Sequence, residues 1–346
     1  MKINVAVITG MLILVCALGI VGCAPEAETS APANFYKGKT IDMVSTGTPG
    51  TTDDLQVRTV TSYLSRDTGA AVVVSDRHGA GGMDGMNYLY ESEPDGLTLG
   101  EVSSNKFVAN KVLDEPAAKY DIEKFSYIMG IGRRQTCFCV SPDGPYQSIA
   151  DIKAGEDLKL GATSPSGYFS LADLTVIKLL ELDATVITGF GVGDEIAAAV
   201  KRGELAGYAS STSGNLPRIE AGMVKPLFIL ARERDSLMPD VPAITELVSL
   251  SVEDLELVKL WERTLCSSTL LMAPPGIPED KLEFLRDLAQ KWMQDEEFRE
   301  AIDAVSGEPV QTYISGEDVS RSMQDTMAEM DKFREIFVEL IEKYRA

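Results

Sequence analysis

Short β-rich runs alternate with amphipathic helical stretches along most of this chain, and this alternation limits its fold more than any other feature. The first series predicts strands at 40–45, 71–75 and 97–102, with helices over about 52–68 and 83–92. Parallel strands need a crossover connection, so this β-α-β-α-β order predicts a mainly parallel sheet with helices on both faces. A second series predicts another such unit, with strands at 136–141, 157–162, 185–188 and 205–209 and helices over about 166–182 and 194–202.

The remaining predicted elements form no third sheet of their own. They are strands at 227–231, 269–273 and 309–313 and helices over about 279–294 and 318–345. We assign them to the first unit, which becomes discontinuous: domain 1 comprises residues 35–135 and 230–346, and domain 2 comprises residues 136–229. The chain then crosses between the domains near 133–139 and 228–232, and two crossing strands make a hinge.

The last predicted helix gathers methionine and aromatic residues near one face. These residues are Val319, Met323, Met327, Met330, Phe333, Phe337, Leu340 and Tyr344. Such a stripe predicts a helix packed on the protein's own core, and a groove for a partner is the alternative.

The N-terminal segment has the pattern of an export signal. Lys2 is followed by an apolar run from Val5 to Val21 that carries no charge. Small residues before Cys23 resemble the bacterial lipobox, in which the cysteine is lipidated and the preceding residues are cleaved. We therefore predict a lipoprotein signal peptide over 1–22, a tether over 23–34 and an extracytoplasmic protein held at the membrane by its lipid. A membrane-spanning anchor is the alternative, because the apolar run is at the lower edge of spanning length.

Three of the five cysteines lie beyond the predicted signal and lipid site: Cys137, Cys139 and Cys266. Cys137 and Cys139 are two residues apart on a predicted strand, so their side chains point to the same face. This spacing favours two buried thiols over a mutual disulfide. A bridge from either residue to Cys266 is the alternative in an oxidising compartment.

Charge and histidine content exclude several classes of function. The chain has 32 Lys and Arg against 53 Asp and Glu, a formal net charge of -21, so it offers no basic face for nucleic acid. His78 is its single histidine, so the usual proton shuttle of Ser-His and Cys-His enzymes is almost missing. We predict a protein that is not an enzyme, that binds no nucleic acid and that needs no cofactor or metal.

Several loops between predicted strands and helices could hold an anion. A helix N-terminus offers unpaired N–H groups and about half a positive charge. The carboxyl ends of parallel strands share one sheet edge, so these loops should line a cleft between the domains. They are residues 46–54, 163–168, 189–194 and 210–215, and in the second loop Ser164 is the expected N-cap, with Pro165 at the first helical position. We expect the cleft to be neutral to positive, because peptide N–H groups offset the acidic body.

A further glycine run at 79–85 lies between a predicted strand and a helix. Its spacing is not G-x-G-x-x-G, and no acidic residue ends the next strand, which argues against a dinucleotide site. We interpret this run as a glycine-built wall beside the pocket.

Motifs in order along the chain resemble the extracytoplasmic solute-binding proteins of tripartite tricarboxylate transporters, the Bug family. The matching segments are Pro49-Gly50-Thr51-Thr52-Asp53-Asp54 with Arg58 after it, Asp76-Arg77-His78-Gly79-Ala80-Gly81-Gly82, Pro94-Asp95-Gly96-Leu97-Thr98-Leu99, Leu237-Met238-Pro239-Asp240-Val241-Pro242 and Met272-Ala273-Pro274-Pro275-Gly276-Ile277-Pro278. The resemblance runs from about Tyr36 to the C-terminus.

This resemblance implies a two-lobed α/β fold of the type II periplasmic-binding-protein kind, each lobe a mainly parallel sheet flanked by helices. It implies a monomeric receptor that binds a small organic carboxylate in the interdomain cleft and delivers it to membrane permease subunits. The positions it points to are Thr48, Gly50, Thr51, Asp54, Thr163, Ser164, Ser166 and Gly167. The same loops add the candidates Thr52, Ser170, Gly191, Val192, Gly193, Asp194 and Ser211. A ligand-sensing module for a signalling partner is the alternative function, and an enzyme on this fold is a further one.

Departures from the family pattern bear on the ligand. Ser170 stands where many members have histidine, and Phe190-Gly191-Val192 stands where they have Tyr-Lys-Gly, so a common cation near the pocket is lost. Thr51 and Thr52 replace glycines and narrow the first loop. Fewer positive charges favour a monocarboxylate or a neutral-tailed ligand over a citrate-like trianion.

Overall fold

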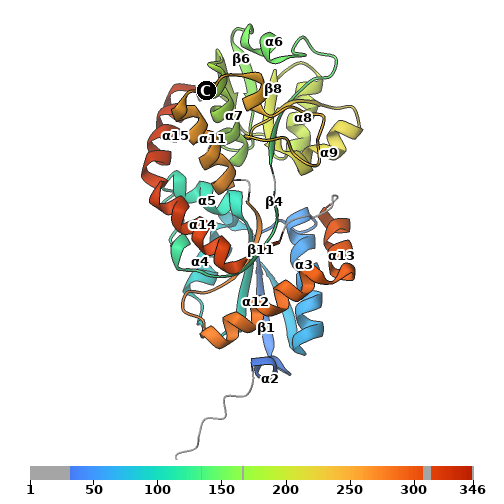
Figure 1. The fold of residues 1–346 in the computed structure, drawn as a ribbon, viewed down its shortest axis with the longest axis vertical. Helices are drawn as coiled ribbons and strands as arrows, with labels where there is room; N and C mark the ends of the chain where they lie inside the picture. Colours follow the sequence, from blue (N-terminus) through green and yellow to red (C-terminus); the bar gives the residue numbers. More distant parts are fainter. Residues whose placement is uncertain (1–31, 134, 166, 266, 307–312, 345–346) are drawn as a thin grey trace, which may run out of the picture.

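The structure, a computed structural model, describes residues 32–133, 135–165, 167–265, 267–306 and 313–344. These residues form two lobes, each built on one sheet and lying one above the other in Figure 1. The predicted signal peptide, Cys23, Ser166 and Cys266 lie outside the described residues, as do most of the tether and of the strand predicted at 309–313. In the described part of the chain, no helix is long and apolar enough to cross a membrane.

Lobe 1 is built on a six-stranded sheet with the order β11-β4-β10-β3-β1-β2. Its strands are β1 (Thr40–Ser45), β2 (Ala71–Asp76), β3 (Thr98–Ser103), β4 (Ser126–Arg133), β10 (Ser267–Ala273) and β11 (Tyr313–Ser315). β1 pairs in parallel with β2 and β3, whereas β10 is antiparallel to β3 and β4. The carboxyl ends of β1, β2 and β3 therefore share the edge that faces lobe 2 (Figure 1).

Lobe 2 is built on a five-stranded sheet with the order β7-β6-β8-β5-β9. Its strands are β5 (Thr136–Val140), β6 (Leu158–Gly161), β7 (Ala184–Ile187), β8 (Gly207–Ser211) and β9 (Lys225–Ile229). β6 is parallel to β7 and β8, and β5 is antiparallel to β8 and β9. Both lobes thus have mixed sheets in which most strands run in one direction.

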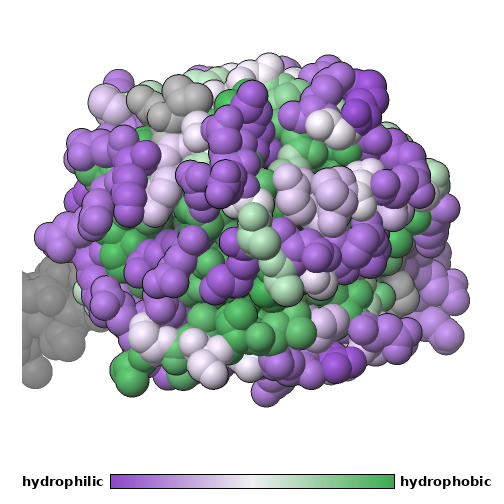
Figure 2. Space-filling model, turned by 90° about the horizontal axis from the view of Figure 1, so that it is seen from above, coloured by the Kyte–Doolittle hydropathy of each residue, from purple (hydrophilic) through white to green (hydrophobic). Residues whose placement is uncertain are grey.

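Helices cover both sheets. In lobe 1 they are α2 (Pro32–Tyr36), α3 (Thr52–Thr68), η1 (Gly79–Gly82), α4 (Met83–Glu91), α5 (Ser104–Val112), η2 (Ile122–Lys124), α12 (Glu279–Gln294), α13 (Glu296–Ser306) and α14 (Gly316–Ala328). In lobe 2 they are α6 (Ile149–Lys153), α7 (Tyr168–Leu180), α8 (Gly193–Lys201), α9 (Thr212–Glu220) and α10 (Ile244–Leu247). Seen from the top of Figure 1, the outer end of lobe 2 is a mixed surface in which hydrophilic side chains separate several hydrophobic areas (Figure 2).

Two further helices, α11 (Val252–Leu265) and α15 (Met330–Tyr344), run beside both lobes (Figure 1). The chain first crosses from lobe 1 to lobe 2 between β4 and β5, and α11 leads it back to β10 in lobe 1. α11 packs against α5 and α14, and α15 packs against α5 of lobe 1 and α7 of lobe 2. One buried hydrophobic cluster, which includes Trp261 of α11, therefore continues from lobe 1 into lobe 2.

The single helix predicted over 318–345 is wrong, because α14 ends at Ala328 and α15 begins at Met330. Glu329 has a non-helical backbone (φ −103°, ψ 0°), and the apolar periodicity that continues across it conceals the break. α14 covers β4, whereas α15 turns toward lobe 2. The stripe packs on the protein's own core as predicted: its buried members are Val319, Met323, Met330, Phe337 and Leu340.

Cys137 and Cys139 are free thiols, fully buried in β5, with their Sγ atoms 3.5 Å apart. Burial, reinforced by the neighbouring thiol, raises the pKa of Cys139. This arrangement confirms the prediction of two buried thiols on one face of the strand.

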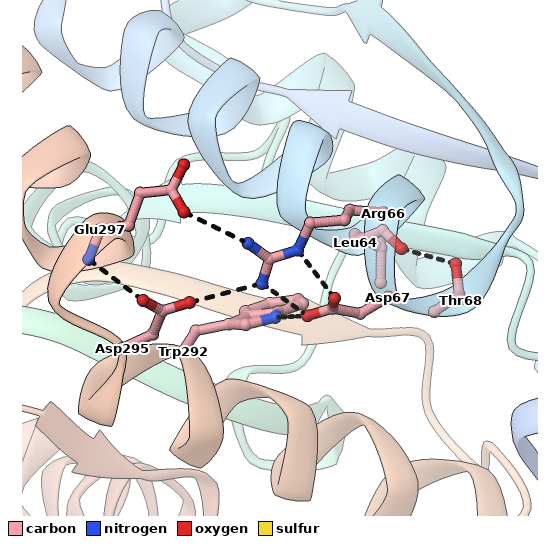
Figure 3. Close-up of polar contacts among 7 residues, drawn as sticks. All are labelled: Leu64, Arg66, Asp67, Thr68, Trp292, Asp295 and Glu297. Atoms are coloured by element: carbon pink, nitrogen blue, oxygen red, sulfur yellow. Dashed lines mark hydrogen bonds and ion pairs between the residues drawn. The ribbon is translucent and has the colours of Figure 1, made fainter.

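A polar network joins α3 to α12 and α13 at the edge of lobe 1 (Figure 3). Arg66 of α3 donates to both carboxylate oxygens of Asp67, at 2.8 and 3.0 Å, and lies 3.5 Å from Asp295 and 4.0 Å from Glu297. The indole N–H of Trp292 donates to the same Asp67 carboxylate at 2.7 Å. Asp67 therefore ties two helices that are far apart in the sequence.

This network predicts a stability that depends on pH. The hydrogen bond from Arg66, with further help from Trp292, lowers the pKa of Asp67 below its ordinary 3.8. The stabilisation is therefore present above about pH 4 and is lost as the pH falls through the lowered pKa. We expect Asp67→Asn to reduce the free energy of unfolding by about 1–2 kcal/mol at pH 7. Urea denaturation at pH 7 and pH 3 should show this difference shrinking in acid.

The matched control is Glu297→Gln, which removes a carboxylate whose side chain is 80% exposed. An exposed ion pair contributes little, so this variant should unfold like the parent chain. If Asp67→Asn lowered the free energy of unfolding equally at pH 7 and pH 3, the pH dependence could not be assigned to Asp67.

Candidate ligand-binding cleft

A cavity of about 490 Å³ lies between the two lobes. Lobe 1 contributes η1, the start of α4, α5 and the turn after α5, and lobe 2 contributes the loop after β6 and the start of α7. The lining residues are Ala80, Gly81, Met83, Ala109, Asn110, Glu115, Thr163, Ser164, Gly167, Tyr168 and Phe169. A cavity of this size at the facing edges of two α/β lobes suits a small organic molecule.

The wall from lobe 2 presents the N-terminus of α7. The helix begins at Tyr168, and its N-cap Gly167 (φ −80°, ψ 168°) provides no side-chain cap. The carbonyl of Ser164 accepts hydrogen bonds from the Ser170 hydroxyl at 2.8 Å and from the Gly167 N–H at 3.4 Å. The first turn of α7 therefore points its partial positive charge at the cavity without a side-chain cap.

The expectation that Ser164 is the N-cap and Pro165 the first helical residue is wrong. The turn from Ser164 to Gly167 closes before the helix begins, so the helix begins later in the chain. A Cβ atom on residue 167 would come within 2.5 Å of the Ser164 hydroxyl oxygen, so a larger residue there would require the Ser164 side chain to move. Because α7 begins later than predicted, Thr163, Ser164 and Gly167 precede the helix and line the cavity.

Contacts with Thr136 and Trp261 hold the side chain of Tyr168 at the start of α7. Its hydroxyl shares a 2.5 Å hydrogen bond with the Thr136 hydroxyl, and its ring stacks on Trp261 at 5.7 Å between centroids. The indole N–H of Trp261 donates to the same Thr136 oxygen at 3.0 Å. These three residues join the cavity wall to β5 and α11, so the position of the wall depends on both crossing segments.

The wall from lobe 1 is built by the glycine run. Ala80, Gly81 and Gly82 have φ of 51°, 68° and 92°, a left-handed path that favours glycine. A Cβ atom on residue 82 would lie 3.2 Å from Cβ of Thr46, so the run packs closely on the first predicted loop. The run lines the cavity, as expected for a glycine-built wall.

The first predicted loop lies beside this wall, and the residues that line the cavity do not include it. Its Asp54 carboxylate accepts from the Gly50 N–H at 2.9 Å and from Arg58 Nε at 3.0 Å. Burial alone would raise the pKa of Asp54, but the contacts with Arg58 and Gly50 outweigh it and lower the pKa. Asp54 and Gly50 thus hold the loop in shape. Its exposed hydroxyl candidates are Thr48, Thr51 and Thr52.

The third predicted loop and Ser211 also lie outside the cavity lining. The Gly191 N–H donates to the Glu195 carboxylate at 2.7 Å, so this peptide group is already used. Val192 is largely exposed, and Ser211 caps α9 by accepting from the Gly214 N–H at 3.2 Å. The structure therefore brings together the second loop and the glycine run, but not all four predicted loops, around this cavity.

Arg218 of α9 is a cation that the loop motifs do not indicate. Its Nε donates to the Asp194 carboxylate at 2.7 Å, and its guanidinium lies so close to the backbone that a Cβ atom on Gly193 would approach it to 2.6 Å. It is one helical turn beyond Asn215, to which it also donates at 3.1 Å. Arg218 supports the start of α8 at the lobe 2 edge.

Sequence reasoning missed the contribution of α5. Ala109, Asn110 and Glu115 line the cavity, but no helix was expected after the strand at 97–102. The signal was present, because Phe107, Val108 and Val112 have helical spacing directly after a parallel strand. The expectation of a neutral to positive cleft stays a prediction, because it depends on peptide N–H groups and distant cations as well as on the lining side chains. Among the described lining residues, Glu115 is the charged one.

Comparisons with known proteins identify the family to which this fold belongs. Residues 56–337 match the family described as "Tripartite tricarboxylate transporter family receptor", TctC. The chain belongs to this family. It is a family of solute-binding receptors, which agrees with the prediction that the protein is not an enzyme.

A curated relative and two solved structures illustrate the similarity. Protein BugT of Bordetella pertussis is 27% identical over 248 residues, which cover 68% of this chain and 73% of BugT. MatC of Rhodopseudomonas palustris with bound malate has a TM-score of 0.66 and 19% identity, covering 86% of this chain and 99% of MatC. Rpa4515 of R. palustris with adipate has a TM-score of 0.68 and 18% identity, covering 86% and 97%. At these identities the two structures show a shared fold, the predicted two-lobed type.

Proposed function

We propose that this receptor binds a small organic carboxylate in the cleft between its lobes and delivers it to the membrane permease subunits of a tripartite transporter. The observation that carries the proposal is the cavity of about 490 Å³ with the uncapped N-terminus of α7 in its wall. A helix N-terminus stabilises a negative charge with peptide N–H groups and the helix dipole. The malate and adipate in the two solved relatives support a carboxylate as the ligand class.

The ligand's acid group should lie at the start of α7, near the hydroxyls of Thr163 and Ser164. Neither Lys nor Arg is among the described residues that line the cavity, and in this proposal peptide groups and hydroxyls offset the charge. This limits how many carboxylates the site can hold, which favours a ligand with one acid group in the cleft. Movement of the two lobes relative to each other would then enclose the ligand.

We further propose that the protein acts outside the cytoplasm as a lipid-anchored monomer. Support comes from the sequence, where small residues precede Cys23 after an apolar run. Of the segment 23–34, residues 32–34 belong to α2, and the small and polar residues 24–31 would connect the lipid to the receptor.

A ligand panel tests the proposed function. The chain from residue 24 onward is titrated by calorimetry with mono-, di- and tricarboxylates and with uncharged amides of the same acids. A ligand at 100 times its Kd should stabilise the folded receptor by about 2.7 kcal/mol, which a thermal melt detects. We expect at least one acid to bind and its amide to fail. Absence of both heat and thermal shift with every acid would refute the carboxylate receptor.

A further inference from the structure

Glu115 is an acidic residue in a cleft that is proposed to bind an acid. Among the described residues that line the cavity, it is the one with a charged side chain. It belongs to lobe 1, whereas the uncapped start of α7 belongs to lobe 2, so the two lobes each contribute one of these features to the cavity. A ligand enclosed between the lobes would meet both.

The position of Glu115 is fixed by the turn that ends α5. Asp114 takes a left-handed backbone (φ 52°), and the Glu115 N–H donates to the Asn110 carbonyl at 3.0 Å. Asn110 also lines the cavity, so the turn folds back along the cavity wall. Residue 115 is thus placed by backbone hydrogen bonding rather than by its own side chain.

Two cations near this turn, Arg334 and Lys111, have other partners. Arg334 of α15 lies 3.8 Å from Asp114 and donates to the carbonyls of Lys111 and Val112 at the end of α5. The Lys111 ammonium donates to the Ala118 carbonyl at 3.2 Å. Among the described residues, none forms an ion pair or hydrogen bond with the Glu115 carboxylate.

A second carboxylate in the cleft carries a cost for an anionic ligand. Like charges that share a partly enclosed site repel, and the apolar residues of the wall weaken the screening by water. A ligand that brings its own positive charge to the lobe 1 side would turn this repulsion into attraction. Ala80, Met83, Ala109 and Phe169 offer an apolar surface for the remainder of such a ligand.

We propose that Glu115 selects ligands that carry an ammonium group in addition to the carboxylate, so that the receptor prefers an amino acid to the same acid without its amino group. This inference rests on the proposed function, because it needs the acid group at the start of α7. The carboxylate then meets the peptide N–H groups of lobe 2, and the ammonium meets Glu115 of lobe 1. Simultaneous contact with both walls would also favour the closed arrangement of the lobes.

The test uses matched pairs of acids that differ in one amino group. Calorimetric titrations compare leucine with 4-methylpentanoate, phenylalanine with 3-phenylpropanoate, and glutamate with glutarate. In the parent chain, we expect the tightest-binding amino acid to bind at least about tenfold more tightly than its partner acid. Glu115→Gln should reduce this preference to about twofold or less, because the ammonium loses its counter-charge while the side chain keeps its size.

The control variant is Glu123→Gln in η2, an exposed glutamate that does not line the cavity. It has the same change in charge and should keep the parent's preference. Partner acids that bind as tightly as their amino acids in the parent chain would overturn the role of Glu115 and leave the carboxylate receptor standing. A preference that survives Glu115→Gln would do the same. If no acid of either kind binds, the proposed function fails together with this inference.

Discussion

Trp261→Ala should reduce the free energy of unfolding by about 3–5 kcal/mol, the cost of removing a fully buried tryptophan. The variant loses the ring that stacks on Tyr168 and the N–H that donates to Thr136, and it leaves a cavity where the hydrophobic cluster passes between the lobes. Since Tyr168 begins the helix that lines the cleft, ligand affinity should fall as well. Denaturant unfolding and calorimetric titration of the bound acid measure the two effects.

Trp292→Ala is the matched control, because Trp292 is only 1% exposed but lies in the lobe 1 cluster beneath α3 and α13. It should lose a similar free energy of unfolding and keep its ligand affinity when assayed well below its melting temperature. Trp261→Phe, which keeps a ring for stacking, should retain most of the affinity. Equal loss of affinity in both alanine variants would show that Trp261 has no special connection to the cleft.

Ser164→Asp should lower the affinity for a carboxylate by roughly 30–100-fold, about 2–3 kcal/mol. The new carboxylate would lie in the cavity wall, beside the proposed position of the ligand's acid group. The fold should survive, because an acidic residue near a helix N-terminus is favourable and α7 has no side-chain cap. Calorimetric titration measures the affinity, and a thermal melt without ligand reports whether the fold is kept.

The control for this change is Ser148→Asp at the N-cap of α6. It adds the same charge at a helix start that is not part of the cavity lining, so the affinity should stay within about twofold of the parent. Unchanged affinity in Ser164→Asp would move the acid group away from the start of α7. An equal loss in both variants would point to a general effect of net charge.

The sequence predicts best those elements whose signal is local. β1 at 40–45 and the helix over 279–294 agree with the structure at both ends, because turn residues bound a strand in one case and Pro278 precedes a strongly amphipathic run in the other. The single helix predicted over 318–345 fails for the opposite reason. The apolar period continues through Glu329, and only packing on different lobes separates α14 from α15.

In the candidate site, too, some features follow from the local sequence and others only from tertiary packing. The loops and their helix starts can be recognised in the sequence, but which of them meet depends on how two sheets face each other. The second loop and the glycine run both line the cavity. In the loops 46–54 and 189–194, by contrast, the Gly50 and Gly191 N–H groups donate to Asp54 and Glu195. The local sequence does not show whether the N–H group of a loop glycine is available to a ligand or donates to a carboxylate four residues later.

The sequence by itself determined the α/β class, the two lobes and the family, because periodicity, turn residues and ordered motifs are properties of neighbouring residues. Only the tertiary structure decided that α5 lines the cleft, that Trp261 stacks on Tyr168 within a cluster shared by both lobes, and that Glu115 and the start of α7 line the same cavity. These contacts join segments that are far apart along the chain, and they form because burying apolar surface brings the two lobes and the helices beside them together.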